Sequence, residues 1–155
     1  MIRGLVQNDR EEVIALLRAT KNFSEPEIAI AEELIEICIE KADEEDYHAF
    51  VADVEGRVAG FLLLGPTPAT TGTYDMYWIA AHPDFQGRGI AQELDDFAVR
   101  FVTERGGYLL IAETSSQPGY QRTRAFYTKQ GYETLAHIAD YYKPGDDLII
   151  FGKRV

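Results

Sequence analysis

The stretch that decides the fold is "HPDFQGRGIAQEL", residues 82–94. It follows an apolar run over residues 76–81 and leads into a sequence with the apolar spacing of an amphipathic helix. The first N–H groups of a helix have no partners within it, and the helix dipole adds partial positive charge there. Gly87 and Gly89 lack the Cβ atoms that would keep an anion away, and Ala91 keeps the first helical turn narrow. The loop therefore predicts a phosphate site made of backbone amides.

Two further side chains belong to this loop, and two commoner phosphate loops do not fit it. Gln86 can hold the loop or reach the ligand, and Arg88 adds one positive charge. The P-loop pattern G-x-x-x-x-G-K-S/T is absent, and "GRG" lacks the third glycine of the dinucleotide fingerprint. A Gly-x-Gly pair alone indicates an ordinary tight turn. The preceding strand, the spacing Gln86-x-x-Gly89-x-Ala91 and the following helix together favour phosphate binding.

Patterns on both sides of the loop predict an α/β protein. The expected strands are residues 1–6, a hairpin over 48–65 that turns at Glu55–Gly56, and residues 73–81, 108–114, 132–138 and 148–153. The expected helices begin at Asn8 or Asp9, at Ser24, near Ile90 and near Tyr120, and both Asp9–Glu12 and Ser24–Glu27 have capping-box spacing. This order predicts one domain over residues 1–155 with a meander in its middle, and not a strictly alternating nucleotide-binding fold.

The composition narrows the classes of partner. The formal net charge is −11, from 26 acidic against 15 basic residues. Nucleic-acid phosphates are bound by concentrated Lys and Arg, so this balance argues against a nucleic-acid partner. It weakly favours a cationic small molecule or a basic peptide, or it serves solubility alone. The apolar stretches are too short to cross a bilayer, so we expect no membrane partner.

Cysteine and histidine usage predicts neither a disulfide nor a metal site. Cys38 is the single cysteine and lies on the apolar stripe of its helix, so we expect it in the core. His48 and His137 have no ligand spacing between them, and His82 stands where a turn begins. The first residues carry acids where a signal peptide has its apolar segment. These observations predict a cytoplasmic protein.

The loop and a second motif resemble the GNAT superfamily of N-acetyltransferases. The pyrophosphate motif of that superfamily reads Gln or Arg, two residues, Gly, one residue, and Gly or Ala. Its last helix carries a Tyr followed four residues later by Gly and an aromatic residue, as in "TRAFYTKQGYE" at residues 123–133. The matching positions are Gln86, Gly89 and Ala91 in the first motif and Tyr127, Gly131 and Tyr132 in the second. The order of elements fits the superfamily along nearly the whole chain.

The resemblance implies a fold and a reaction. The implied fold is a mixed, mostly antiparallel central sheet of about seven strands with about four helices, in which the fourth strand splays from the fifth. The implied reaction transfers acetyl from acetyl-CoA, as co-substrate, to an amine by direct attack in a ternary complex without a metal. The implied coenzyme-binding residues are Ile79, Ala80, Ala81, Gln86, Gly87, Arg88, Gly89, Ile90, Ala91, Tyr120 and Tyr127. Tyr120 departs from the superfamily, which often has a coenzyme-binding Asn there, so that contact is lost or replaced.

The reaction also requires proton transfer. An alkylammonium with a pKa of ~10.4 must lose a proton before it attacks, and a leaving thiolate with a pKa of ~8.5 must gain one. The resemblance implies that Tyr127 donates to the thiolate, although a Tyr there can also serve the core alone. It implies Asp75 as the base, since histone-acetylating members carry a Glu at that strand position; Asp75 can equally be paired to a neighbour. Tyr77 shares the face of Asp75, and Glu113 is a weaker candidate.

The acceptor is less determined. We expect its site between the first two helices and the late strands. "ADYYKPGDDL", residues 139–148, resembles the substrate-binding tyrosines of N-terminal peptide acetyltransferases, or it is a polar hairpin. "EKADEEDY", residues 40–47, attracts a cationic acceptor or is an exposed helix end. The leading hypothesis is acetylation of a small amine or amino-acid-like molecule. The alternatives are a peptide N-terminal acetyltransferase, a non-catalytic acyl-CoA sensor, and a homodimer in which late strands pair between subunits.

Overall fold

The computed structural model describes all 155 residues and places them in one seven-stranded sheet flanked by helices. The strands are β1 (Ile2–Gly4), β2 (His48–Val54), β3 (Arg57–Pro66), β4 (Thr73–Ala81), β5 (Leu109–Ser115), β6 (Glu133–Lys143) and β7 (Asp146–Arg154). The helices are α1 (Arg10–Ala19), α2 (Glu25–Glu40), α3 (Ile90–Glu104) and α4 (Gln121–Lys129). The strand order is β1-β2-β3-β4-β5-β7-β6, and only the β4–β5 pair is parallel. The expected mixed, mostly antiparallel sheet is confirmed.

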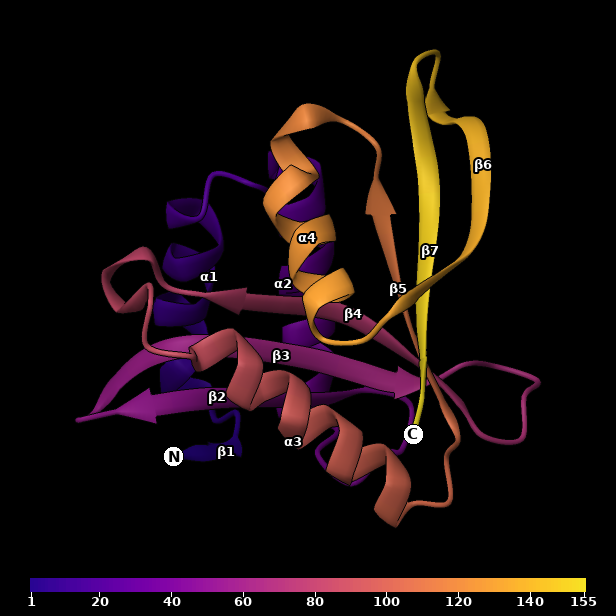
Figure 1. Ribbon diagram of the computed structural model, residues 1–155. Coiled ribbons are helices and arrows are strands. Elements are labelled where there is room, and N and C mark those ends of the chain that lie inside the picture. The colour runs from indigo at the N-terminus through magenta and orange to yellow at the C-terminus, as the bar shows by residue number, and fades with distance from the viewer.

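Helices cover both faces of the sheet and create two cores. Figure 1 shows α3 and α4 in front of the sheet and α1 and α2 behind it. The apolar stripe of α3 packs in one core with Leu62 and Leu64 of β3, and the buried residues of α1 and α2 pack in the other with Phe61 and Leu63. β3 serves both cores because its successive side chains point to opposite faces. It is buried from Val58 to Gly65, as the long apolar run in its sequence requires.

β4 and β5 separate after a short parallel pairing. Only Thr73–Asp75 lies in register with Leu109–Ile111. Beyond these residues β4 continues beside β3 and β5 continues beside β7. Figure 1 shows the two strands diverging, with α4 in front of the space between them. The splay between the fourth and fifth strands is therefore confirmed, and it leaves strand edges with unpaired backbone groups inside the molecule.

The capping box predicted for α2 is confirmed. Ser24 Oγ accepts a hydrogen bond from the Glu27 N–H at 3.3 Å, and the Glu27 carboxylate accepts one from the Ser24 N–H at 3.2 Å. Pro26 occupies the first turn, where its missing N–H would have no partner in any case. These contacts fix the start of α2, and with it the position of the Glu27 side chain.

The capping box predicted for α1 is wrong. The Asp9 carboxylate accepts a hydrogen bond from the Val6 N–H at 2.9 Å and pairs with the Arg3 guanidinium at 2.7 Å. The Glu12 carboxylate instead accepts from the Val58 N–H at 3.1 Å. Asp9 is only 5% exposed, and a carboxylate buried to that degree is stable only with a charged partner. Arg3, which lies on β1, therefore decides the position of the Asp9 side chain, and the capping-box spacing does not reveal this contact.

The last hairpin is longer than expected. We expected strands over 132–138 and 148–153, but β6 extends to Lys143 and β7 begins at Asp146. β6 is the edge strand and is exposed along almost its whole length, so it lacks the apolar alternation that marks a half-buried strand. Asp140, with a φ of 56°, lies where the β6–β7 register shifts. The hairpin brings Tyr142 and Asp146 to the wall of the cavity described below.

The remaining expectations concern cysteine, the histidines and membranes. Cys38 packs against the core of α1 and α2, and burial raises the pKa of its thiol to about 11. His82 Nδ1 accepts a hydrogen bond from the Asp84 N–H at 3.0 Å, so His82 is a turn residue. No group of three or more His, Cys, Asp or Glu side chains is arranged to hold a metal ion. None of the helices combines the length and the apolar character of a membrane span.

Candidate functional site

The loop after β4 presents backbone N–H groups that have no acceptor in the chain. A 3₁₀ turn covers Pro83–Phe85, and the first hydrogen bond of α3 runs from the Glu93 N–H to the Gly89 carbonyl at 2.9 Å. The N–H groups that find no acceptor are those of Gly87, Gly89, Ile90, Ala91 and Gln92. They lie at the N-terminus of a 15-residue helix, whose dipole adds partial positive charge. This geometry suits a bound phosphate.

Both glycines of the loop adopt a left-handed backbone conformation. The φ angle is +79° at Gly87 and +74° at Gly89, a region that residues with a Cβ rarely adopt. A Cβ atom built on either glycine meets no other atom within 4 Å. The glycines are therefore required by the backbone of the loop, and nothing in the chain fills the space in front of them.

Arg88 lies outside the cavity, unlike the other loop residues that we predicted to bind the coenzyme. Its N–H donates to the Phe85 carbonyl at 3.3 Å, and its guanidinium lies 5.3 Å from the centre of the Phe85 ring. It does not line the cavity, whereas the other predicted loop residues do. Gln92, which the motif did not indicate, also lines the cavity. Its position in the first turn of α3 was the signal that sequence reasoning missed.

The splay exposes backbone groups of β4 to the gap. The His82 N–H donates to the Ala59 carbonyl at 2.8 Å, and hydrogen-bonded pairs alternate along an antiparallel ladder. In this register Ala80 bonds to β3, whereas the N–H and C=O groups of Ile79 and Ala81 point toward the gap. All three residues line the cavity. Ile79 and Ala81 thus have backbone groups that are free to bind a ligand. The backbone groups of Ala80 are already bonded to β3, so Ala80 can only contact a ligand.

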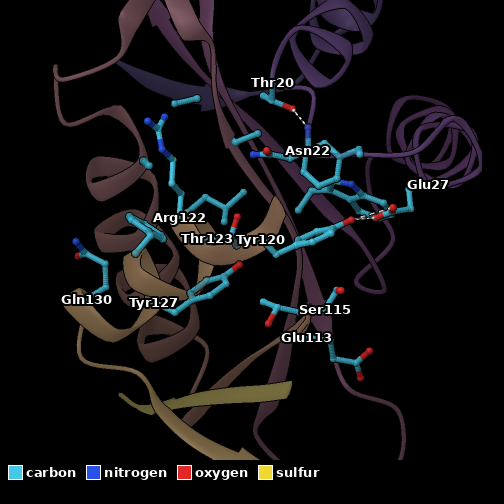
Figure 2. A pocket seen from close by; sticks show the side chains of 18 of the residues that line it. Thr20, Asn22, Glu27, Glu113, Ser115, Tyr120, Arg122, Thr123, Tyr127 and Gln130 are labelled. Atoms are coloured by element: carbon cyan, nitrogen blue, oxygen red, sulfur yellow. Dashed lines mark hydrogen bonds between the residues drawn. The ribbon is translucent and has the colours of Figure 1, made fainter. Parts of the chain in front are cut away.

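A cavity of about 840 Å³ is lined from both sides of this gap. One part, which we call the loop half, is lined by Gln86, Gly87, Gly89, Ala91, Arg122 and Tyr127. The other part, the carboxylate half, is lined by Glu27, Tyr77, Glu113, Tyr120, Tyr142 and Asp146. Figure 2 shows Arg122 and Tyr127 on one side of Tyr120, and Glu27 on the other. The cavity therefore joins a site that can bind an anion to a site that carries negative charge itself.

Tyr127 brings a hydroxyl group to the loop half. The residue is 5% exposed, and its ring packs against the rings of Tyr132 and Phe151 with centres 5.1 and 5.5 Å apart. Its hydroxyl takes part in none of the side-chain hydrogen bonds of the chain, and Figure 2 draws none from it to the labelled residues of the cavity wall. Burial, and to a lesser degree the charge of Asp95, raises the pKa of the phenol. Tyr127 therefore keeps its proton at neutral pH and can donate it to a ligand.

Asp75 lies behind the wall of the cavity and does not line it. Its carboxylate accepts a hydrogen bond from Thr67 Oγ1 at 2.8 Å and lies 3.5 Å from the Tyr77 hydroxyl. Tyr77 does line the cavity, and burial followed by the charge of Asp75 raises the pKa of its phenol. Two neighbouring hydroxyl groups thus hold the Asp75 carboxylate. The Tyr77 side chain lines the cavity and connects Asp75 to it.

β5 contributes three consecutive polar residues to the cavity. Glu113 lines it directly, and burial followed by the charge of Asp75 raises the pKa of its carboxyl. Thr114 is 4% exposed, and its Oγ1 is a buried polar atom with no hydrogen-bond partner. Ser115 Oγ donates to the Asp146 carboxylate. Sequence reasoning gave Glu113 low weight and missed Thr114 and Ser115, although a run of polar residues ending a buried strand was a usable signal.

Tyr120 points away from the loop. Its hydroxyl donates to the Glu27 carboxylate at 3.1 Å, and Figure 2 shows this bond directed across the cavity to α2. Burial, and then the charge of Glu27, raises the pKa of the phenol to about 12. The structure therefore brings Tyr120 to the carboxylate half, away from the amides with which we had grouped it.

Arg124 fixes the segment that carries these tyrosines. Its Nη1 donates to the carbonyl groups of Ser115 at 2.7 Å and Gln117 at 2.9 Å. These bonds tie the first turn of α4 to the end of β5. Arg124 thereby sets the positions of Tyr120 and Tyr127 relative to the gap, and Arg is suited to this because its planar head donates to two carbonyls at once.

Comparison with known families decides the relationship. The model of the family described as "Acetyltransferase (GNAT) family" matches residues 10–132. The chain belongs to the GNAT family of acetyltransferases. A crystal structure of a Desulfovibrio desulfuricans protein assigned to the GNAT family agrees with this: it is 36% identical, the match covers 99% of this chain and 98% of that one, and the TM-score is 0.95. No curated protein matches the chain significantly.

More distant GNAT structures share the fold. An aminoglycoside 6′-N-acetyltransferase complexed with coenzyme A is 17% identical, with 99% of this chain and 96% of that one covered and a TM-score of 0.77. The ribosomal-protein-S18-alanine N-acetyltransferase of Escherichia coli is 19% identical, with 100% and 93% covered and a TM-score of 0.77. At this identity the likeness concerns the fold, and these two neighbours act on different acceptors.

The residues of the loop half fit coenzyme A. The free N–H groups can bind a diphosphate, and the guanidinium of Arg122 adds positive charge on the same side of the cavity. The backbone edges of Ile79 and Ala81 can pair with an extended amide-bearing chain, as a strand edge pairs with a peptide. Thr114 Oγ1 leaves a hydrogen bond for a bound polar group.

Proposed function

We propose that this GNAT protein is an N-acetyltransferase that transfers the acetyl group of acetyl-CoA to a primary amine of a small acceptor, by direct attack in a ternary complex. The observation that carries the proposal is the cavity through the β4–β5 gap. It joins an anion-binding loop and a free phenol on one side to carboxylates and tyrosines on the other. A ternary mechanism needs such a connection, because both substrates must meet in one space.

Each part of the loop half has a task in this reaction. Acetyl-CoA supplies an acyl carbon activated as a thioester. The free amides of Gly87 and of residues 89–92 hold its diphosphate, and the Ile79 and Ala81 backbone aligns the chain that leads to the sulfur. Tyr127 donates its proton to the sulfur as the carbon–sulfur bond breaks, because its hydroxyl is free within the chain.

The incoming ammonium must give up a proton, and two carboxylates can receive it. Glu113 lines the cavity and needs no intermediary. We propose Asp75 as a second acceptor that acts through the Tyr77 hydroxyl. Burial, followed by the charge of Asp75, raises the pKa of Glu113, so its carboxylate binds a proton more readily than an ordinary Glu does.

A peptide N-terminus is the second candidate acceptor. The observation that favours it is the β6–β7 hairpin, which brings Tyr142 to the cavity wall while Tyr141 is 55% exposed beside it. Adjacent aromatic side chains on a projecting hairpin can hold an extended peptide. The same panel of acceptors tests both candidates.

The test is release of coenzyme A thiol from acetyl-CoA in the presence of diamines, monoamines, amino acids, aminoglycosides and short peptides. We expect turnover with at least one small amine and an acetylated product of the correct mass. We expect Cys38 to react only slowly with the thiol reagent, because burial raises the pKa of its thiol to about 11. Turnover confined to peptides would support the second candidate. Coenzyme binding without turnover on any amine would indicate an acyl-CoA sensor and would contradict the proposal.

A further inference from the structure

The carboxylate half has a charge that the chain does not neutralise. Glu27, Glu113 and Asp146 line it, and none of them takes part in an ion pair. Among the basic residues that line the cavity, Lys143 lies opposite Asp146 in the β6–β7 register, whereas Arg122 and Lys129 belong to α4. Three carboxylates against one ammonium leave two negative charges.

The hydrogen bonds to these carboxylates all come from uncharged groups. Glu27 accepts from the Ser24 N–H and hydroxyl and from the Tyr120 hydroxyl, and Asp146 accepts from the Ser115 hydroxyl. Such bonds fix the direction of the Glu27 and Asp146 carboxylates without removing their charge. A set of oriented, uncompensated carboxylates in a cavity attracts a cation more strongly than the same groups on an open surface.

Aromatic side chains complete the walls of the carboxylate half. The tyrosines are Tyr77, Tyr120 and Tyr142, and Trp78 and Phe23 line the same cavity. The faces of aromatic rings attract organic cations, and their hydrocarbon surface contacts an alkyl chain. Carboxylates and rings together therefore suit an alkyl chain that carries a positive charge.

Thr114 gives an independent indication of a ligand. Its Oγ1 is fully buried without a partner, and buried hydroxyls are nearly always hydrogen-bonded in native proteins. Side chains alternate along β5, so Thr114 faces the core of α3 and α4 with Ala112, whereas Glu113 faces the other side. Both residues line the same cavity, so the unpaired hydroxyl belongs to the space that also contains the three carboxylates. A polar atom of the reacting groups would give the Thr114 hydroxyl its missing hydrogen bond.

We propose that the acceptor is an alkyl diamine or polyamine: one amine reacts beside Thr114 and Tyr127, within reach of Glu113, and a second, protonated amine is held by Glu27 and Asp146 among the tyrosines. This inference rests on the proposed N-acetyltransferase function and adds the class of acceptor. An amino acid fits less well, because its carboxylate would lie among carboxylates. A monoamine lacks the second charge.

The reaction balances without a further reactant. The reacting ammonium loses one proton to a cavity carboxylate, and its nitrogen forms the bond to the acyl carbon as the carbon–sulfur bond breaks. A second proton leaves the nitrogen as the amide forms, and the thiolate takes one proton from Tyr127, which is then reprotonated. The products are the N-acetyl amine, coenzyme A thiol and one released proton, and the distal ammonium stays charged.

The first test compares three acceptors of equal length: pentanediamine, pentylamine and 5-aminopentanoate. Their free ends are positive, neutral and negative. We expect kcat/KM to fall in that order, with about a tenfold difference at each step, and the differences to shrink as salt screens the charges. Equal values for the three acceptors, or a preference for the amino acid, would overturn the inference.

The second test removes one charge without disturbing the fold. Glu27→Gln keeps an oxygen for the capping box and for Tyr120, since Gln also serves at that position. We expect it to lower the ratio of kcat/KM for pentanediamine over pentylamine about tenfold. The matched control is Glu33→Gln, an exposed acid on the same helix without an ion pair, which should leave the ratio unchanged. An unchanged ratio in Glu27→Gln would count against the proposed site.

A third measurement separates this inference from the proposed function. Hexamethonium carries two quaternary ammonium groups and cannot be acetylated. We expect calorimetry to show that it binds the parent protein and competes with pentanediamine, and that Glu27→Gln weakens its binding about tenfold. Hexamethonium binding without acetylation of any amine would contradict the proposed function and leave the cation site supported. Amine acetylation without hexamethonium binding and without a preference for the diamine would contradict the diamine inference and leave the proposed function supported.

Discussion

Replacing Gly89 with aspartate is expected to abolish binding of acetyl-CoA. Gly89 caps α3 with a φ of +74°, and its N–H is among those without an acceptor. An Asp side chain there would accept hydrogen bonds from neighbouring amides and place a negative charge where the diphosphate belongs. We expect the Kd to rise at least about 100-fold, which corresponds to about 2.7 kcal/mol. Isothermal titration calorimetry measures the change.

The control for this substitution is Gly56→Asp. Gly56 lies in the β2–β3 turn with a φ of +81°, and a Cβ there also meets nothing within 4 Å. It therefore carries the same backbone strain and the same added charge, but it does not line the cavity. We expect Gly56→Asp to lose stability as Gly89→Asp does and to keep coenzyme affinity. Equal affinities of Gly89→Asp and the parent would contradict the role of the loop.

Replacing Tyr127 with phenylalanine is expected to lower kcat about 100-fold and to change the Kd for acetyl-CoA less than about threefold. The hydroxyl is free within the chain, so its removal strands no partner and leaves the packing against Tyr132 and Phe151 in place. General acid catalysis by a positioned side chain contributes about 10²–10⁴-fold. Steady-state kinetics, together with calorimetry for the coenzyme, measures the two quantities separately.

Tyr132→Phe is the matched control for Tyr127→Phe. The Tyr132 hydroxyl donates to the buried carboxylate of Asp95 at 2.6 Å, so its loss should cost about 1.5–3 kcal/mol of stability. We expect this variant to melt at a lower temperature and to keep its kcat. Tyr127→Phe should keep its melting temperature and lose kcat. A Tyr127→Phe protein with parental kcat would assign Tyr127 to the core alone.

The sequence predicts the elements that local pattern determines. The amphipathic stripe of α3, the turn at Glu55–Gly56 and the capping box at Ser24 all appear where expected, because each depends on residues within one or two turns of one another. The free amides of the loop after β4 belong to this class as well, because the glycines and the short side chain that leave them accessible lie within one short stretch.

Features that depend on partners in other elements were not predictable in the same way. Asp9 turns to Arg3 and Tyr120 turns to Glu27, and in each case the partner comes from another element. Asp75 has the strand position of a base, yet the start of the splay places it behind Tyr77. Glu113 and Thr114 lie on opposite faces of β5, and both reach the cavity only because β4 has moved away.

The most direct test of the account follows the backbone amides of the loop by NMR during a titration with acetyl-CoA. The central claim is that the free N–H groups after Phe85 bind the diphosphate. It predicts large downfield shifts of the amide protons of Gly87, Gly89, Ile90 and Ala91, because these N–H groups gain charged acceptors. The Arg88 amide, already bonded to the Phe85 carbonyl, should shift less. Absence of binding, or binding that leaves these four amides unchanged, would contradict the account.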